Sequence, residues 1–126
     1  MTLEHAEAAL REAALAYPEA WEDFPWEERV IKVRKKIFVF LGMIETELRV
    51  GLKLPESAPA ALALPGVVPA GYGLGKAGWI NVRYGPADEP PLDLLREWLD
   101  ESYRAIAPKT LVAKLPPPGV LPSAAG

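Results

Sequence analysis

The fold of this 126-residue chain is decided by residues 30–54, which read VIKVRKKIFVFLGMIETELRVGLKL. Val30–Val33 and Ile37–Leu41 are rich in β-branched and aromatic side chains, and this composition predicts two strands. The charged break Arg34–Lys36 lies between them and is short enough for a hairpin loop. The stretch therefore predicts an antiparallel strand pair with a basic tip.

A third and a fourth strand follow from alternation. From Leu48 to Leu54 the apolar residues alternate with Glu47, Arg49, Gly51 and Lys53, a pattern typical of a strand with one buried and one wet face. Gly42–Thr46 is the expected connecting turn. Trp79–Tyr84 predicts another strand, with Ile80, Val82 and Tyr84 on one face and Trp79, Asn81 and Arg83 on the other.

Helices are predicted at both ends of the chain. Apolar residues at helical spacing indicate a first helix over about 2–17, with Thr2 as N-cap and Pro18 as its end. A short helix is expected at 56–64, followed by a glycine-rich loop at 66–78. The last long helix begins after Pro90-Pro91 and ends at Pro108, with Leu95, Trp98, Leu99, Ser102 and Ile106 on its apolar stripe.

The element order is helix, three strands, short helix, strand and long helix. Hairpin-length connections favour an antiparallel sheet, and the terminal helices would pack on its apolar face. We therefore expect a single α+β domain over residues 1–115. A proline-rich C-terminal tail would occupy residues 116–126.

Composition excludes several classes of function. The chain has no cysteine, one histidine, three serines and three threonines, which argues against thiolate or multi-histidine metal sites and hydroxyl nucleophiles. We therefore expect no metal, no cofactor and no enzymatic activity. Adjacent acids such as Asp100-Glu101 are interpreted as solvated surface. Fourteen prolines, one asparagine and no glutamine make a thermophile-like composition.

No apolar run is long enough to span a membrane, and the N-terminus is acidic before its apolar part. These features argue against membrane insertion and against a secretory signal. We expect a cytoplasmic protein that is a monomer.

Charge is segregated along the chain. Residues 1–28 carry eight acids and one base, a balance of −7, whereas residues 29–53 carry seven bases and two acids, a balance of +5. A basic hairpin of this kind can grip DNA phosphates. The candidate nucleic-acid-binding residues are Arg29, Lys32, Arg34, Lys35 and Lys36. Two structural alternatives remain open: the basic strands pair with the acidic helix, or the exposed lysines block edge-to-edge aggregation.

The loop at 66–78 offers a second candidate site. Gly73–Gly78 matches G-x-G-x-x-G, but a strand follows it where a dinucleotide-binding motif requires a helix. Glycine-rich backbone can still form an anion-binding nest, here beside Lys76, with Trp79, Asn81 and Arg83 on the next strand. The alternative function is thus a small-molecule, anion or protein-interaction module using this loop. The structural alternative is that the loop binds nothing. In that case the glycines are needed for positive φ in a tight loop, and the loop covers Trp79.

Three segments together resemble the MmcQ/YjbR-like family over roughly residues 3–115: YPEAWEDFPW (17–26), PAGYGLGKAGWINV (69–82) and LREWLDESYRAIAPK (95–109). The resemblance implies an α+β domain with a CyaY-like, double-wing arrangement. It also implies a DNA-binding label without an established biochemical role. Family pattern positions fall on Tyr72, Lys76, Trp79, Ser102, Tyr103 and Lys109, and no catalytic residue is carried over.

Overall fold

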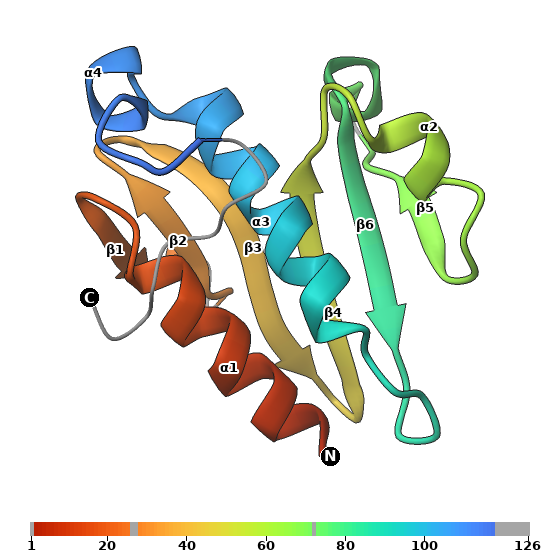
Figure 1. The fold of residues 1–126 in the computed structure, drawn as a ribbon. Helices are drawn as coiled ribbons and strands as arrows, with labels where there is room; N and C mark the ends of the chain where they lie inside the picture. The colour runs from red at the N-terminus through yellow and green to blue at the C-terminus, as the bar shows by residue number, and fades with distance from the viewer. Residues whose placement is uncertain (1, 26–27, 72, 118–126) are drawn as a thin grey trace.

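The structure is a computed structural model that describes residues 2–25, 28–71 and 73–117. One antiparallel sheet is flanked by helices at the two ends of the chain (Figure 1). In chain order the elements are α1 (Leu3–Leu15), β1 (Ala20–Asp23), β2 (Val30–Val33), β3 (Lys36–Ile44), β4 (Glu47–Lys53), α2 (Ala58–Ala61), β5 (Val67–Pro69), η2 (Leu74–Ala77), β6 (Trp79–Tyr84), α3 (Leu92–Ile106) and α4 (Lys109–Val112).

The sheet has six strands in the order β1-β2-β3-β4-β6-β5, and every neighbouring pair is antiparallel. The two long helices, α1 and α3, lie side by side across one face of it (Figure 1). This arrangement confirms the expected α+β class, with an antiparallel sheet between N-terminal and C-terminal helices.

The strand register divides the sheet into two faces. The inner face packs on the helices and includes Ile31, Leu41, Val50, Ile80 and Val82, all at most 3 % exposed. The opposite face, which we call the outer face, is more polar. Its polar residues are Asp23, Lys32, Glu47, Arg49, Lys53, Asn81 and Arg83, and it also carries Trp21, Val30, Ile37, Phe40, Ile44 and Trp79.

The sequence features predicted for the two long helices are present in the structure. The Thr2 side chain accepts a hydrogen bond from the His5 N–H at 3.0 Å, which confirms the predicted N-cap of α1. Residues Leu95, Trp98, Leu99, Ser102 and Tyr103 of α3 are buried against the sheet, close to the predicted stripe. An apolar stripe on each helix therefore fixes which face of the sheet becomes the core.

A β-bulge in β3 brings a side chain of the sheet into contact with α3. Ile31 pairs with Val39 but Lys32 pairs with Ile37, so Phe38 is an extra residue in its strand. The ring of Phe38 packs edge-on against Tyr17 and Tyr103, with ring centroids 6.2 and 5.1 Å away. This aromatic cluster joins the end of α1, the bulge and α3.

Several predicted boundaries were wrong. No strand was predicted before Val30, yet Ala20–Asp23 forms β1, and the predicted loop at 66–78 contains β5 and η2. The expected turn at Gly42–Thr46 is shorter, because β3 continues through Ile44. The expected helix at 56–64 is regular only over Ala58–Ala61. The edge strands β1 and β5 form because they pair with β2 and β6.

No helix in the described ranges has both the length and the apolarity needed to cross a bilayer. Most of the predicted tail, residues 118–126 of 116–126, lies outside the described residues. Before that point, the guanidinium of Arg104 donates a 2.6 Å hydrogen bond to the Pro116 carbonyl. The first residue of the tail is therefore held against α3.

Candidate nucleic-acid interface

The tip of the β2–β3 hairpin is a two-residue loop formed by Arg34 and Lys35. The expected three-residue break was wrong by one, because Lys36 already pairs with Val33. Arg34 has a φ of 55°, a left-handed conformation that is uncommon for a residue with a side chain. The tip therefore needs contacts that hold it in place.

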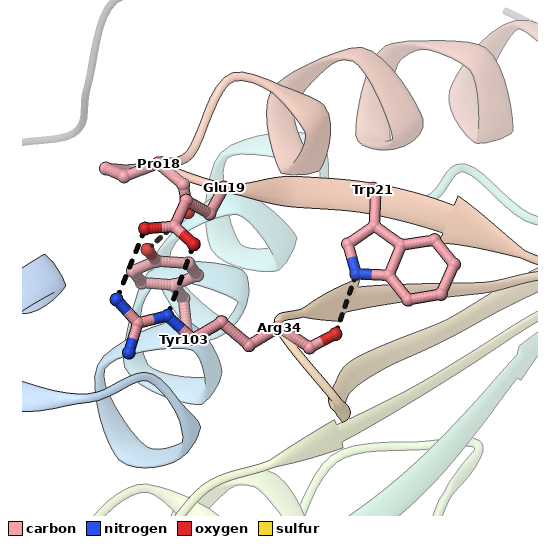
Figure 2. Close-up of polar contacts among 5 residues, drawn as sticks. All are labelled: Pro18, Glu19, Trp21, Arg34 and Tyr103. Carbon is pink, nitrogen blue, oxygen red and sulfur yellow. Dashed lines mark hydrogen bonds and ion pairs between the residues drawn. The ribbon is translucent and has the colours of Figure 1, made fainter.

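Those contacts are visible in Figure 2, which draws side chains from three separate segments. The Arg34 guanidinium donates to both carboxylate oxygens of Glu19, at 3.2 and 3.3 Å. The Trp21 indole N–H donates to the Arg34 carbonyl at 2.7 Å. Behind them, the Tyr103 hydroxyl donates to the Pro18 carbonyl at 2.7 Å. Together these contacts tie the tip to β1 and the preceding turn, and tie that turn to α3.

Electrostatics at the tip follow from this pairing. The Arg34 guanidinium lowers the pKa of Glu19, and Glu19 in turn raises the pKa of Arg34. Burial, with a smaller contribution from Glu19, raises the pKa of Tyr103 to about 12. Arg34 therefore stays charged, but its charge is matched by a neighbouring carboxylate.

Two other predicted cations are also paired. Arg29 forms a short ion pair with Glu7 on α1 and lies 3.5 Å from Glu22. Lys32 lies 2.8 Å from the Asp23 carboxylate and 5.2 Å from the centroid of the Trp21 ring. This hydrogen bond from Lys32 is the main cause that lowers the pKa of Asp23. Pairing between basic strands and acidic elements, one of the alternatives left open, thus accounts for these two residues.

Lys35 and Lys36 differ from the other three. Both side chains are exposed, and within the described ranges neither forms an ion pair. Of the five candidates at the hairpin, these two offer charge that the protein does not neutralise itself. The rigid tip presents them to solvent.

The outer face adds cations that the hairpin prediction did not include. Arg49 and Lys53 on β4 lie opposite Arg83 and Trp79 on β6. Lys53 has no acidic partner among the described residues, and Arg49 only reaches Glu47 at 4.0 Å. The alternation in residues 47–54 already placed Arg49 and Lys53 on the wet face. That signal could have added them to the candidate interface.

Trp79 is not an exposed stacking surface. It is only 9 % exposed and packs edge-on against Phe40, with ring centroids 5.7 Å apart. Asn81 is exposed and lies opposite Gly51, where a Cβ would approach its Oδ1 to 2.8 Å. The interpretation of Trp79 as a small satellite core on the outer face fits this burial.

The loop site is only partly described. Lys76 is exposed on η2, and Tyr72 lies outside the described residues. Gly73 and Gly78 flank η2 with φ of 79° and 93°, the left-handed region that favours glycine. Backbone geometry is therefore enough to explain these two glycines of the G-x-G-x-x-G match.

Two of the family pattern positions on α3 have structural contacts. The Ser102 hydroxyl is fully buried, donates to the Phe38 carbonyl at 2.5 Å and accepts from the Lys53 N–H at 2.9 Å. Tyr103 holds Pro18 as described above. Lys109 is exposed at the start of α4.

The expectation that Asp100-Glu101 is solvated surface was wrong. Asp100 is 5 % exposed and accepts hydrogen bonds from the Tyr17 hydroxyl and the Arg104 guanidinium, both at 2.7 Å. Glu101 accepts from the Ser57 N–H and hydroxyl. The i, i+4 spacing of Asp100 and Arg104 was a visible sequence signal for the contact between these two residues. The contact between Glu101 and Ser57 depends on tertiary structure and has no such signal.

Charge is distributed unevenly between the two sides of the sheet. Each long helix carries two more acids than bases: three against one in α1 and four against two in α3. The outer face carries four bases and two acids, a balance of +2. The segregation seen along the chain is therefore also a segregation in space.

A family model described as YjbR matches residues 15–105. The chain belongs to the YjbR family. The crystal structure of a Deinococcus radiodurans protein with the DUF419 family-model domain is similar to this YjbR-family chain, with 28 % sequence identity, a TM-score of 0.67 and 85 % of each chain covered. No curated protein matches. The comparisons confirm the predicted family, while the CyaY-like and double-wing descriptions stay predictions.

Proposed function

We propose that this YjbR-family domain is a non-enzymatic DNA-binding domain that contacts backbone phosphates. The observation that carries the proposal is the exposed, unneutralised pair Lys35 and Lys36 on a hairpin tip held by Glu19, Trp21 and Arg34. A rigid tip loses little conformational entropy when it binds, so its contacts are more effective.

The charge distribution supports the same proposal. The chain has a net charge of −3, so DNA is attracted only if positive charge is gathered away from the acids. The outer face is such a region, since the acidic excess of α1 and α3 lies on the other side of the sheet, and Lys35 and Lys36 add exposed charge at the hairpin. The protein's field would therefore orient the outer face toward a duplex during the encounter.

A binding measurement with paired variants tests the proposal. We expect the variant Lys35→Gln/Lys36→Gln to bind a fluorescently labelled DNA duplex roughly tenfold more weakly than the wild type at low salt. The estimate follows because each exposed ionic contact contributes up to about 1 kcal/mol. Fluorescence anisotropy measures the affinities.

Arg96→Gln is the matched control. Arg96 is a half-exposed cation on α3, on the opposite side of the sheet, and lies 3.7 Å from the Asp93 carboxylate. This variant should bind DNA like the wild type. Absence of DNA binding by the wild type at low salt would overturn the proposal, and so would equal weakening by both variants.

The second candidate function is a protein-interaction or anion-binding module at the loop 66–78. It is favoured by two apolar side chains there, Val68 and Leu74, which are 50 % and 43 % exposed beside the cation Lys76. Amide NMR shifts distinguish the two candidates. Shifts confined to residues 66–78 on addition of small anions support the loop, whereas shifts at the hairpin and outer face on addition of DNA support the first proposal.

A further inference from the structure

We infer that Arg49 and Arg83 form a binding subsite for a phosphate group on the outer face. The two residues are direct partners in the β4–β6 register, so both side chains project from the same face at neighbouring positions. Directly opposed residues have Cβ atoms about 5 Å apart. Like charges at that spacing repel one another, and a shared anion converts the repulsion into attraction.

The hydrogen-bonding state of Arg49 points the same way. Its Nε is shielded from solvent and has no hydrogen-bond partner among the described residues. Among the residues that the structure describes, the one carboxylate oxygen within 4.0 Å belongs to Glu47 and lies 4.0 Å from Nη2, which is beyond a hydrogen bond. The Arg49 side chain is nevertheless 41 % exposed, so part of the guanidinium faces solvent. It therefore has donors left to bind a ligand.

The strand next to Arg49 leaves room for a ligand. Gly42 of β3 is the partner of Arg49 on its other side, and nothing lies within 4 Å of the position where a Cβ would be. Asn81, two residues before Arg83 on the same face, is exposed and carries further hydrogen-bonding groups. The position beside Arg49 on β3 is thus open, although its Nε is shielded from solvent.

The guanidinium geometry selects the ligand class. Its planar set of N–H donors matches the oxygens of a phosphate, and two such groups can bind one phosphate from two sides. The phosphate could belong to a DNA backbone or to a phosphorylated small molecule. If the phosphate belongs to DNA, the subsite is part of the proposed function and rests on it. If the phosphate belongs to a small molecule, the subsite is independent of the proposed function.

The experiment follows the arginine Nε–Hε signals by NMR during two titrations, one with inorganic phosphate and one with a DNA duplex. Chloride at matched ionic strength is the reference. In both titrations we expect the Arg49 and Arg83 signals to shift. Arg83→Gln and Arg49→Gln should each weaken phosphate binding about tenfold, as expected for loss of one charge-assisted contact.

Controls separate charge, geometry and folding. Arg83→Lys keeps the charge but lacks the planar donors, so it should bind phosphate between the wild type and Arg83→Gln. Arg96→Gln removes a cation on the opposite side of the sheet, leaves the subsite intact and should bind phosphate like the wild type. Dispersed amide spectra establish that each variant is folded, and Arg49→Gln and Arg83→Gln test the subsite independently of one another.

The outcomes distinguish this inference from the proposed function. Shifts at Arg49 and Arg83 with phosphate but no binding of DNA would keep the subsite and overturn the proposed function. DNA binding that is unaffected by both glutamine variants would keep the proposed function and exclude DNA as the source of the phosphate, and phosphate binding that is unaffected by both variants would overturn the subsite. Phosphate shifts no larger than those with chloride, or spread over all arginines alike, would also overturn it.

Discussion

At the residue scale, Ser102 replaces a missing bond of the sheet. Val39 and Leu52 are the last partners of the β3–β4 register, so the next pair would be Phe38 and Lys53. The bulge at Phe38 separates that pair. The Ser102 hydroxyl instead donates to the Phe38 carbonyl and accepts from the Lys53 N–H. The resemblance singled out Ser102 as a motif position without a role, and this contact supplies a structural one.

Replacing this serine should therefore destabilise the protein. Ser102→Ala leaves two backbone groups of adjacent strands without their partner, and we expect a loss of about 1–3 kcal/mol in the free energy of unfolding. Urea denaturation measures it. Thr110→Ala, at an exposed position on α4, should change the stability by less than about 0.5 kcal/mol. A Ser102→Ala loss as small as that of the control would show that the bridge contributes nothing.

Truncation of Trp79 should lower the stability of the protein, whereas truncation of Lys76 should leave it unchanged. Trp79 is nearly buried against Phe40, so Trp79→Ala should cost roughly 3–5 kcal/mol. Lys76→Ala removes an exposed side chain and should leave the melting temperature unchanged. Thermal melts of both variants check this. A small loss for Trp79→Ala, combined with lost ligand binding, would instead identify the indole as the wall of a site.

At the scale of elements, the interior strands could be predicted and the edge strands could not. The strands 30–33, 37–41 and 79–84 are recognisable because their own side chains prefer extended, half-buried backbone. The short edge strands β1 and β5 have the sequences AWED and VVP, which carry a weak local signal. They are strands because β2 and β6 supply hydrogen-bonding partners, and that information is not local.

The hairpin tip should loosen in acid. Arg34 lowers the pKa of Glu19 and Lys32 lowers that of Asp23, so both carboxylates favour the folded state when ionised. Their stabilisation is present above the unfolded-state pKa of about 4 and disappears as the pH falls through the lower, folded-state pKa. Amide hydrogen exchange at residues 32–36 should therefore become less protected toward pH 3, relative to its intrinsic rate.

The matched variant is Glu19→Gln/Asp23→Asn. Its side chains cannot titrate, so the tip should already be less protected near neutral pH and should change little between pH 6 and pH 3. Wild-type protection at the tip that is independent of pH over this range would contradict the account. It would mean that these ion pairs do not hold the hairpin.

At the scale of the whole molecule, the sequence located the basic region but not which of its charges are free. The acids that pair with Arg29, Lys32 and Arg34 come from α1, β1 and the turn between them. They lie 7 to 22 residues away in the chain, and only the sheet topology brings them to the hairpin. The same topology separates the acidic helices from the outer face, which composition alone could not show.

The measurement that tests the central claim most directly is the salt dependence of DNA affinity. Lys35, Lys36 and Lys53 can each neutralise one phosphate, and Arg49 with Arg83 a fourth. The slope of log affinity against log salt should then be about −3.6, or roughly 150-fold weaker binding between about 50 and 200 mM salt. Lys35→Gln/Lys36→Gln should reduce the slope to about −1.8, or roughly 12-fold. An affinity that does not change with salt, or a slope unaltered in that variant, would contradict phosphate binding by this surface.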